Sequence, residues 1–128
     1  MAEAARRILL AEDDRFLRKA AETALKRSGF AVLPAVDGEE ALRTARAEAP
    51  DLILLDLIMP KMQGFEVLRA LKADPATAAI PVVILSNLGQ DGDMKRAMEA
   101  GAVGYFVKAN LSLQDLVKRV GELAAGRA

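Results

Sequence analysis

The sequence predicts an α/β protein, a three-layer αβα sandwich on a five-stranded parallel sheet. Five short apolar runs alternate with five longer amphipathic stretches along the 128 residues, and parallel strands need such helical crossovers, which are right-handed. The run at 52–55 is apolar at every position, as expected of a central strand covered on both faces. A chain of this length builds one core, so we expect residues 1–128 to form a single domain, structured over about residues 6–125.

In the first half of the chain, the pattern predicts strands at 8–11 and 30–35 and helices at 14–28 and from residue 37. Gly29 supplies a stop for the first helix, and Pro50 lies beyond the end of the second. Pro34 falls within the second predicted strand. Because proline cannot donate to a ladder, this strand is expected at an edge of the sheet.

In the second half, the pattern predicts strands at 52–55, 81–85 and 103–107 and helices around 65–71, at 93–100 and from about 112. The last helix has an apolar face at helical spacing, formed by Leu113, Leu116, Val117, Val120 and Leu123. No repeat or linker interrupts this alternation. The organisation is therefore that of a single α/β unit.

The composition excludes several kinds of chemistry. Eighteen basic and eighteen acidic residues cancel, which argues against a non-specific nucleic-acid binder. Neither Cys nor His occurs, so disulfides, thiolate metal sites and histidine general bases are absent. No apolar run is long enough for a signal peptide or a membrane span. We therefore expect a cytoplasmic protein with no membrane partner.

Residues with useful chemistry follow four of the five predicted strands. In an open parallel sheet, functional groups gather beyond the carboxyl ends of the strands, where the strand order reverses. The residues at these ends are Glu12, Asp13 and Asp14 after the first strand, Asp56 after the third, Ser86 after the fourth and Lys108 after the fifth. They are therefore expected to converge on one edge of the sheet.

These residue types together suit phosphoryl transfer. Neighbouring carboxylates repel one another and need a proton or a cation, and an all-oxygen site suits Mg²⁺ (or Mn²⁺). A carboxylate such as Asp56 is also a nucleophile toward phosphorus, giving an acyl phosphate. An ammonium from Lys108 and a hydroxyl from Ser86 would bind oxygens of the transferring group.

Taken singly, each residue also has a purely structural explanation. Asp is a favoured N-cap, and an Asp after a strand often binds turn amides. The structural alternatives are a helix cap for Asp14, a solvated loop for Glu12 and Asp13, a turn for Asp56 and Ser86, and a solvated charge for Lys108. These alternatives leave unexplained why the residues stand together at four different strand ends.

Over essentially its whole length, the chain resembles the receiver domain of two-component response regulators, of the chemotaxis-regulator kind. Residues 50–60 and 64–68 resemble the family's phosphoacceptor strand, loop and helix, and residues 8–14 its acidic opening strand. Two further matching segments are 37–42 and 101–108. The resemblance implies the flavodoxin-like (βα)5 fold with strand order 2-1-3-4-5.

The resemblance also implies the roles of the site residues. Asp56 would be the phosphoacceptor, beside a Mg²⁺ (or Mn²⁺) ion held by Asp13 directly, by Glu12 through water and by the backbone carbonyl of Ile58. Lys108 would bind the phosphoryl group. Ser86 would move toward that group and Tyr105 would move inward with it, although Tyr105 also fits a half-buried aromatic of the sheet.

The implied function is a phosphorylation-dependent signalling switch, which catalyses only its own phosphorylation and dephosphorylation. A sensor histidine kinase, a phosphotransfer protein or a small phosphodonor would supply the phosphoryl group. The fourth helix, fifth strand and fifth helix would present the changed face to a downstream protein or output domain, with Met94, Lys95, Met98 and Val103 contributing. Such methionines more often belong to the core. No direct nucleic-acid contact is expected, and the state would be monomer or phosphorylation-dependent dimer.

Three positions depart from the family pattern, and other functions compete. Ala109 stands where the family usually has a proline, in a cis peptide, after its lysine. A cis bond before a non-proline costs about 2.5–4 kcal/mol, which favours trans but leaves the isomer, and with it the position of Lys108, open. Asn87 replaces a small apolar residue, and Ile58 places an apolar side chain beside the site.

A pseudo-receiver that binds partners without phosphotransfer is the main alternative function. An aspartyl-nucleophile phosphatase would carry a second Asp at position 58, and a nucleotide-binding fold would need a Gly-rich loop after the first strand.

Overall fold

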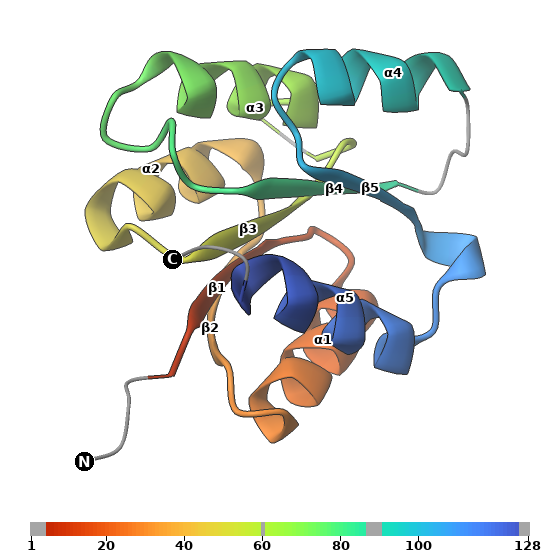
Figure 1. The fold of residues 1–128 in the computed structure, drawn as a ribbon. Helices are drawn as coiled ribbons and strands as arrows, with labels where there is room; N and C mark the ends of the chain where they lie inside the picture. The colour runs from red at the N-terminus through yellow and green to blue at the C-terminus, as the bar shows by residue number, and fades with distance from the viewer. Residues whose placement is uncertain (1–4, 60, 87–90, 126–128) are drawn as a thin grey trace.

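The structure is a computed structural model that describes residues 5–59, 61–86 and 91–125. Strands and helices alternate along this part of the chain (Figure 1). The elements are β1 (Arg7–Ala11), α1 (Arg15–Arg27), β2 (Ala31–Ala35), α2 (Gly38–Glu48), β3 (Leu52–Asp56), α3 (Gly64–Ala73), β4 (Val82–Ser86), α4 (Asp91–Glu99), β5 (Gly104–Val107), a 3₁₀ turn η1 (Lys108–Asn110) and α5 (Leu113–Ala125).

All five strands are parallel and lie in the order β2-β1-β3-β4-β5. Helices α1 and α5 cover one face of the sheet, and α2, α3 and α4 cover the other (Figure 1). Strand β3 is the centre of the register, where Ile53 lies between Leu9 of β1 and Val82 of β4. The predicted fold class and strand order are therefore confirmed.

The apolar run of β3 supplies both halves of the core. Ile53 and Leu55 belong to the cluster under α2, α3 and α4, whereas Leu52 and Leu54 belong to the cluster under α1 and α5. All four side chains are fully buried. Because successive side chains of a strand point to opposite faces, a central strand covered on both sides must be apolar throughout.

Pro34 lies on the edge strand β2, as predicted. The Ala31 N–H donates to Arg6 O, and Ala35 O accepts from the Glu12 N–H, so these two residues face β1. Pro34, one position out of phase with them, faces the free edge. Its missing N–H therefore leaves the β1–β2 ladder intact and removes a donor from the exposed edge, which disfavours pairing with another chain.

The observed element ends differ slightly from the predicted ones. Helix α4 begins at Asp91 rather than at 93, and the 3₁₀ turn after β5 was not predicted. Strand β5 begins at Gly104 rather than at 103, and Val103, which precedes it, donates its N–H to Val82 O of β4. The Lys108–Ala109 peptide, whose isomer the sequence left open, is trans. Asn87 lies outside the described residues.

Candidate functional site

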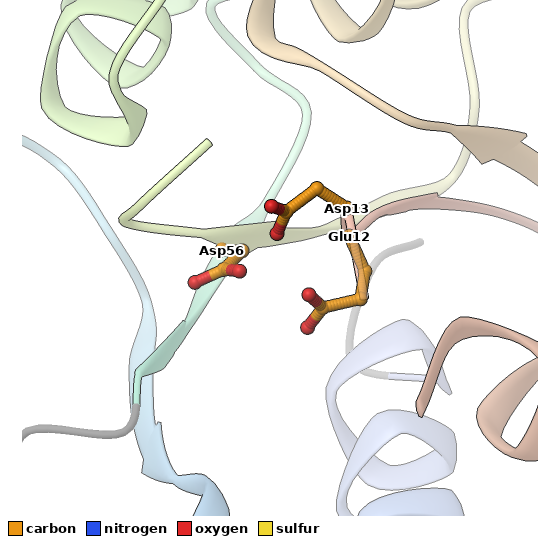
Figure 2. Close-up of side chains that lie close together, drawn as sticks. All are labelled: Glu12, Asp13 and Asp56. Carbon is orange, nitrogen blue, oxygen red and sulfur yellow. The ribbon is translucent and has the colours of Figure 1, made fainter. Parts of the chain in front are cut away.

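Three carboxylates converge at the carboxyl ends of β1 and β3 (Figure 2). Glu12, Asp13 and Asp56 each offer an oxygen, and these oxygens lie within 4.8 Å of one another. Glu12 and Asp56 are buried, with 0% and 5% of their surface exposed, whereas Asp13 faces solvent. The strand topology thus brings together residues more than forty positions apart.

Lys108 reaches the same place from the end of β5. Its Nζ lies 2.5 Å from Glu12 Oε1 and 3.1 Å from Asp56 Oδ2. All three side chains are largely shielded from water, so their charges interact more strongly than surface charges do. The solvated-charge explanation of Lys108 is therefore wrong, because its ammonium is one of the groups that offset the carboxylates.

Burial and the neighbouring charges have opposing effects on the pKa values of Glu12 and Lys108. Burial raises the pKa of Glu12 to about 7; its contacts with Lys108 and the Asp14 N–H oppose that rise, and the Asp56 carboxylate adds to it. For Lys108, burial lowers the pKa, but the carboxylates of Glu12 and Asp56 outweigh it and leave the pKa raised. The charges of Glu12, Asp56 and Lys108 thus offset in part the cost of burying them together.

The carboxylate cluster fits a hard divalent cation. One ammonium compensates two buried carboxylates, while Asp13 adds a third negative charge. Glu12 Oε1 is buried and, within the described residues, accepts no hydrogen bond of good geometry despite its ion pair with Lys108. Because Mg²⁺ prefers carboxylate oxygens and keeps several waters, a partly exposed three-carboxylate site suits it.

Asp14 is separate from the cluster and serves the helix instead. Its Oδ1 accepts from the N–H groups of Phe16 and Leu17, 2.9 and 3.1 Å away, which caps α1. Its own N–H donates to Glu12 Oε2 at 3.0 Å. The helix-cap interpretation of Asp14 is thus confirmed.

Ile58 lies beside the Asp56 carboxylate. Its N–H donates to Asp56 Oδ1 at 3.2 Å, so the loop after β3 binds Asp56 through its backbone. The Ile58 side chain is 64% exposed at this edge of the sheet. The turn-amide role weighed for Asp56 is therefore real, but it accounts for one oxygen, and Lys108 takes the other. The use of the Ile58 carbonyl by a metal stays a prediction.

Ser86 and Tyr105 lie on neighbouring strands. Ser86 is 1% exposed at the end of β4, where it pairs in register with Val107. The preceding residue, Leu85, pairs with Asp56. Tyr105 is half-buried and packs against the cluster under α2, α3 and α4. Their movement on phosphorylation stays a prediction.

One residue near the cluster was missed by the sequence reasoning. Arg18 Nη1 donates to the backbone carbonyls of Glu12, at 2.8 Å, and Asp13, at 3.3 Å. The only available signal was an arginine one helical turn beyond the cap, a spacing at which a side chain can fold back over the preceding loop. Nothing in a single sequence marks such a contact with backbone atoms.

Comparison with known proteins assigns the family. Residues 8–121 match the response regulator receiver domain. The chain belongs to this family, whose members are the receiver modules of two-component signalling systems. Within the described residues, no helix combines the length and the apolar character that crossing a membrane requires.

Similar proteins span several bacteria. The Gliding motility regulatory protein of Myxococcus xanthus is 44% identical over 117 residues, 91% of this chain and 15% of that protein. Transcriptional regulatory protein PrrA of Mycobacterium tuberculosis is 41% identical over 121 residues, 94% of this chain and 51% of that protein. The chain therefore spans only part of the length of these relatives.

Solved structures agree in fold. The receiver domain of the Francisella response regulator 1452 superposes with a TM-score of 0.89 at 28% identity, covering 96% of this chain and 99% of the other. The chemotaxis response regulator CheY4 of Vibrio cholerae gives 0.86 at 27% identity, covering 93% and 98%.

Proposed function

We propose that this chain is a phosphorylation switch in which Asp56 accepts a phosphoryl group. The observation that carries the proposal is the contact of Lys108 Nζ with Asp56 Oδ2 inside a cluster of three carboxylates. A buried carboxylate, held between a backbone N–H and an ammonium, is oriented before any donor arrives.

In the transfer step, the covalent change to the protein is confined to Asp56. A carboxylate oxygen of Asp56 forms the bond to phosphorus while the bond between phosphorus and the donor's leaving group breaks, and the leaving group keeps that electron pair. The ammonium of Lys108, which contacts Asp56 Oδ2, would offset charge on the phosphoryl oxygens. We assign to Ser86 a hydrogen bond to one of those oxygens in the product.

The same proposal includes a divalent cation. Asp13, Glu12 and Asp56, with the Ile58 carbonyl, would hold Mg²⁺ or Mn²⁺ in a site that matches their oxygen donors. When bound, the cation supplies charge neutralisation for the transferring group.

The partners belong to the proposal as well. We assign the phosphodonor to a sensor histidine kinase or phosphotransfer protein in the cytoplasm, and the output to a downstream protein or domain that binds the α4–β5–α5 face. Met94, Met98 and Val103 are 40%, 46% and 43% exposed there. The core interpretation of the two methionines is wrong, since Ala97 fills the buried position of α4 instead. Exposed methionines suit an adaptable partner surface.

Incubation with acetyl phosphate and Mg²⁺ is expected to add one phosphoryl group to the intact mass. Asp56→Asn should lose the adduct, because an amide is not a competent nucleophile. Asp14→Asn is the matched control, since Asn also caps helices and residue 14 is outside the cluster. It should retain the adduct.

Three results, the second from a separate assay with phosphoesters, would contradict the proposal. A wild-type chain without an adduct would indicate a pseudo-receiver, and rapid turnover of external phosphoesters would indicate a phosphatase. An adduct that survives in Asp56→Asn would place the phosphoacceptor elsewhere.

The phosphorylated state is expected to be long-lived, persisting for minutes on a Phos-tag gel. Ile58, 64% exposed beside Asp56, offers no group to orient or deprotonate an attacking water. Ile58→Asp places an acid/base carboxylate at that position and should speed the decay by about tenfold or more. Decay of the wild type within seconds would contradict this prediction.

A further inference from the structure

Arg18 of helix α1 binds the backbone of the acidic turn, which is formed by residues 12–14 between β1 and α1. Its Nη1 donates to two consecutive backbone carbonyls, those of Glu12 and Asp13. The turn is also attached to the sheet by the Glu12 N–H, which donates to Ala35 O at 3.0 Å. The Glu12–Asp13 segment is therefore held to the edge strand on one side and to α1 on the other.

The Asp13 carboxylate depends on this backbone support more than the carboxylates of Glu12 and Asp56 do. The Glu12 and Asp56 carboxylates are both oriented by Lys108. Within the described residues, the Asp13 carboxylate has no hydrogen bond or ion pair of its own, and the side chain is exposed. Its place in the cluster is therefore set by the backbone of residue 13, which Arg18 binds at the carbonyl.

We propose that Arg18 is a positioning residue for the cation site, which acts by holding the Asp13 backbone so that its carboxylate stays within reach of Glu12 and Asp56. This inference rests on the proposed function, because it assumes that the cluster binds a divalent cation. Groups that orient metal ligands commonly set affinity, although they never touch the metal.

A purely electrostatic effect of Arg18 and a positioning role predict opposite changes in Mg²⁺ affinity when the residue is replaced. The inference is therefore testable. Removing a positive charge near a cation site should strengthen cation binding, by the electrostatic effect alone. Removing the support of a ligand should weaken it. Arg15 is the matched control: it lies on the same helix end, is exposed, and makes no hydrogen bond or ion pair with any described residue.

The experiment is a titration of the full chain with MgCl₂, followed by the amide resonances of an NMR spectrum, with no phosphodonor present. Arg18→Ala is expected to weaken Mg²⁺ binding by about tenfold. Arg15→Ala should bind as tightly as the wild type or more tightly. Arg18→Lys, which keeps the charge and one donor group, should fall between the wild type and Arg18→Ala.

Each outcome decides a separate question. An Arg18→Ala affinity equal to or tighter than that of the wild type overturns the positioning role and leaves the proposed function intact. A wild type that binds no Mg²⁺ overturns the metal part of the proposed function itself. If the spectrum of Arg18→Ala is collapsed, Arg18→Lys decides: weaker binding with a dispersed spectrum supports the inference, and unchanged binding overturns it.

Discussion

Replacing Gly64 with alanine is expected to lower the free energy of unfolding by about 3 kcal/mol and the Tm by about 10 °C. A Cβ at this position would lie 2.5 Å from Asp56 O and 2.6 Å from the Cα of Leu57. Both are backbone atoms, which cannot rotate aside. The start of α3 must therefore move away from the end of β3, which carries Asp56.

Gly64→Ala is also expected to reduce phosphorylation at the site. The Gly64 N–H donates to Leu57 O at 2.9 Å, so the same displacement breaks the bond that closes the loop after Asp56. Thermal unfolding by circular dichroism measures the first effect, and the acetyl phosphate adduct measures the second.

Gly92→Ala is the matched control for this substitution. Gly92 lies in α4, and an added Cβ there meets no atom within 4 Å. Alanine should be neutral or stabilising, by at most about 1 kcal/mol. Equal losses of stability in the two variants would contradict the explanation by backbone contact.

Replacing Lys108 with methionine is expected to slow phosphoryl transfer to Asp56 by about 100-fold. The apolar stem is kept, but the ammonium that contacts Asp56 Oδ2 and Glu12 Oε1 is lost. Two buried carboxylates then remain uncompensated, which should lower the free energy of unfolding by about 3 kcal/mol in a chelator. The rate is measured from adduct formation, and the stability from denaturant unfolding.

Mg²⁺ should narrow the difference in free energy of unfolding between the wild type and Lys108→Met. A cation at ten times its Kd contributes about 1.4 kcal/mol, and the variant should bind it more tightly because no ammonium competes. Lys61→Met is the matched control, because Lys61 is largely exposed and lies 3.6 Å from Asp37. Such surface pairs contribute about 0–1 kcal/mol. A transfer rate unchanged in Lys108→Met would contradict the role assigned to this amine.

Much of the fold was predictable because its signals are local. The all-apolar β3, the stop at Gly29 and the edge position of Pro34 follow from periodicity and from backbone chemistry within a few residues. The convergence of Asp56 and Lys108 was predictable too. Parallel strands place their carboxyl ends at one edge, wherever those strands lie in the chain.

The division of labour in the acidic turn was decided by the tertiary structure. The family resemblance had separated Glu12 and Asp13 from Asp14, but the chemistry of three consecutive carboxylates does not. The path of the chain into α1 supplies the physical reason, because it turns Asp14 to the helix cap while Glu12 and Asp13 face Asp56. Arg18 could not be found beforehand, since it binds carbonyls that every residue carries. The same holds for Gly64, whose role depends on a backbone that passes close by.

By itself, then, the sequence determined the fold class, the order of elements and the set of residues at the carboxyl edge of the sheet. Burial patterns and strand ends depend on residues that are close together in the sequence, so local patterns reveal them. The tertiary structure decided which oxygens meet which nitrogens. Lys108 and Asp56 are 52 positions apart, and the contact between them depends on the register and twist of strands that no local pattern specifies.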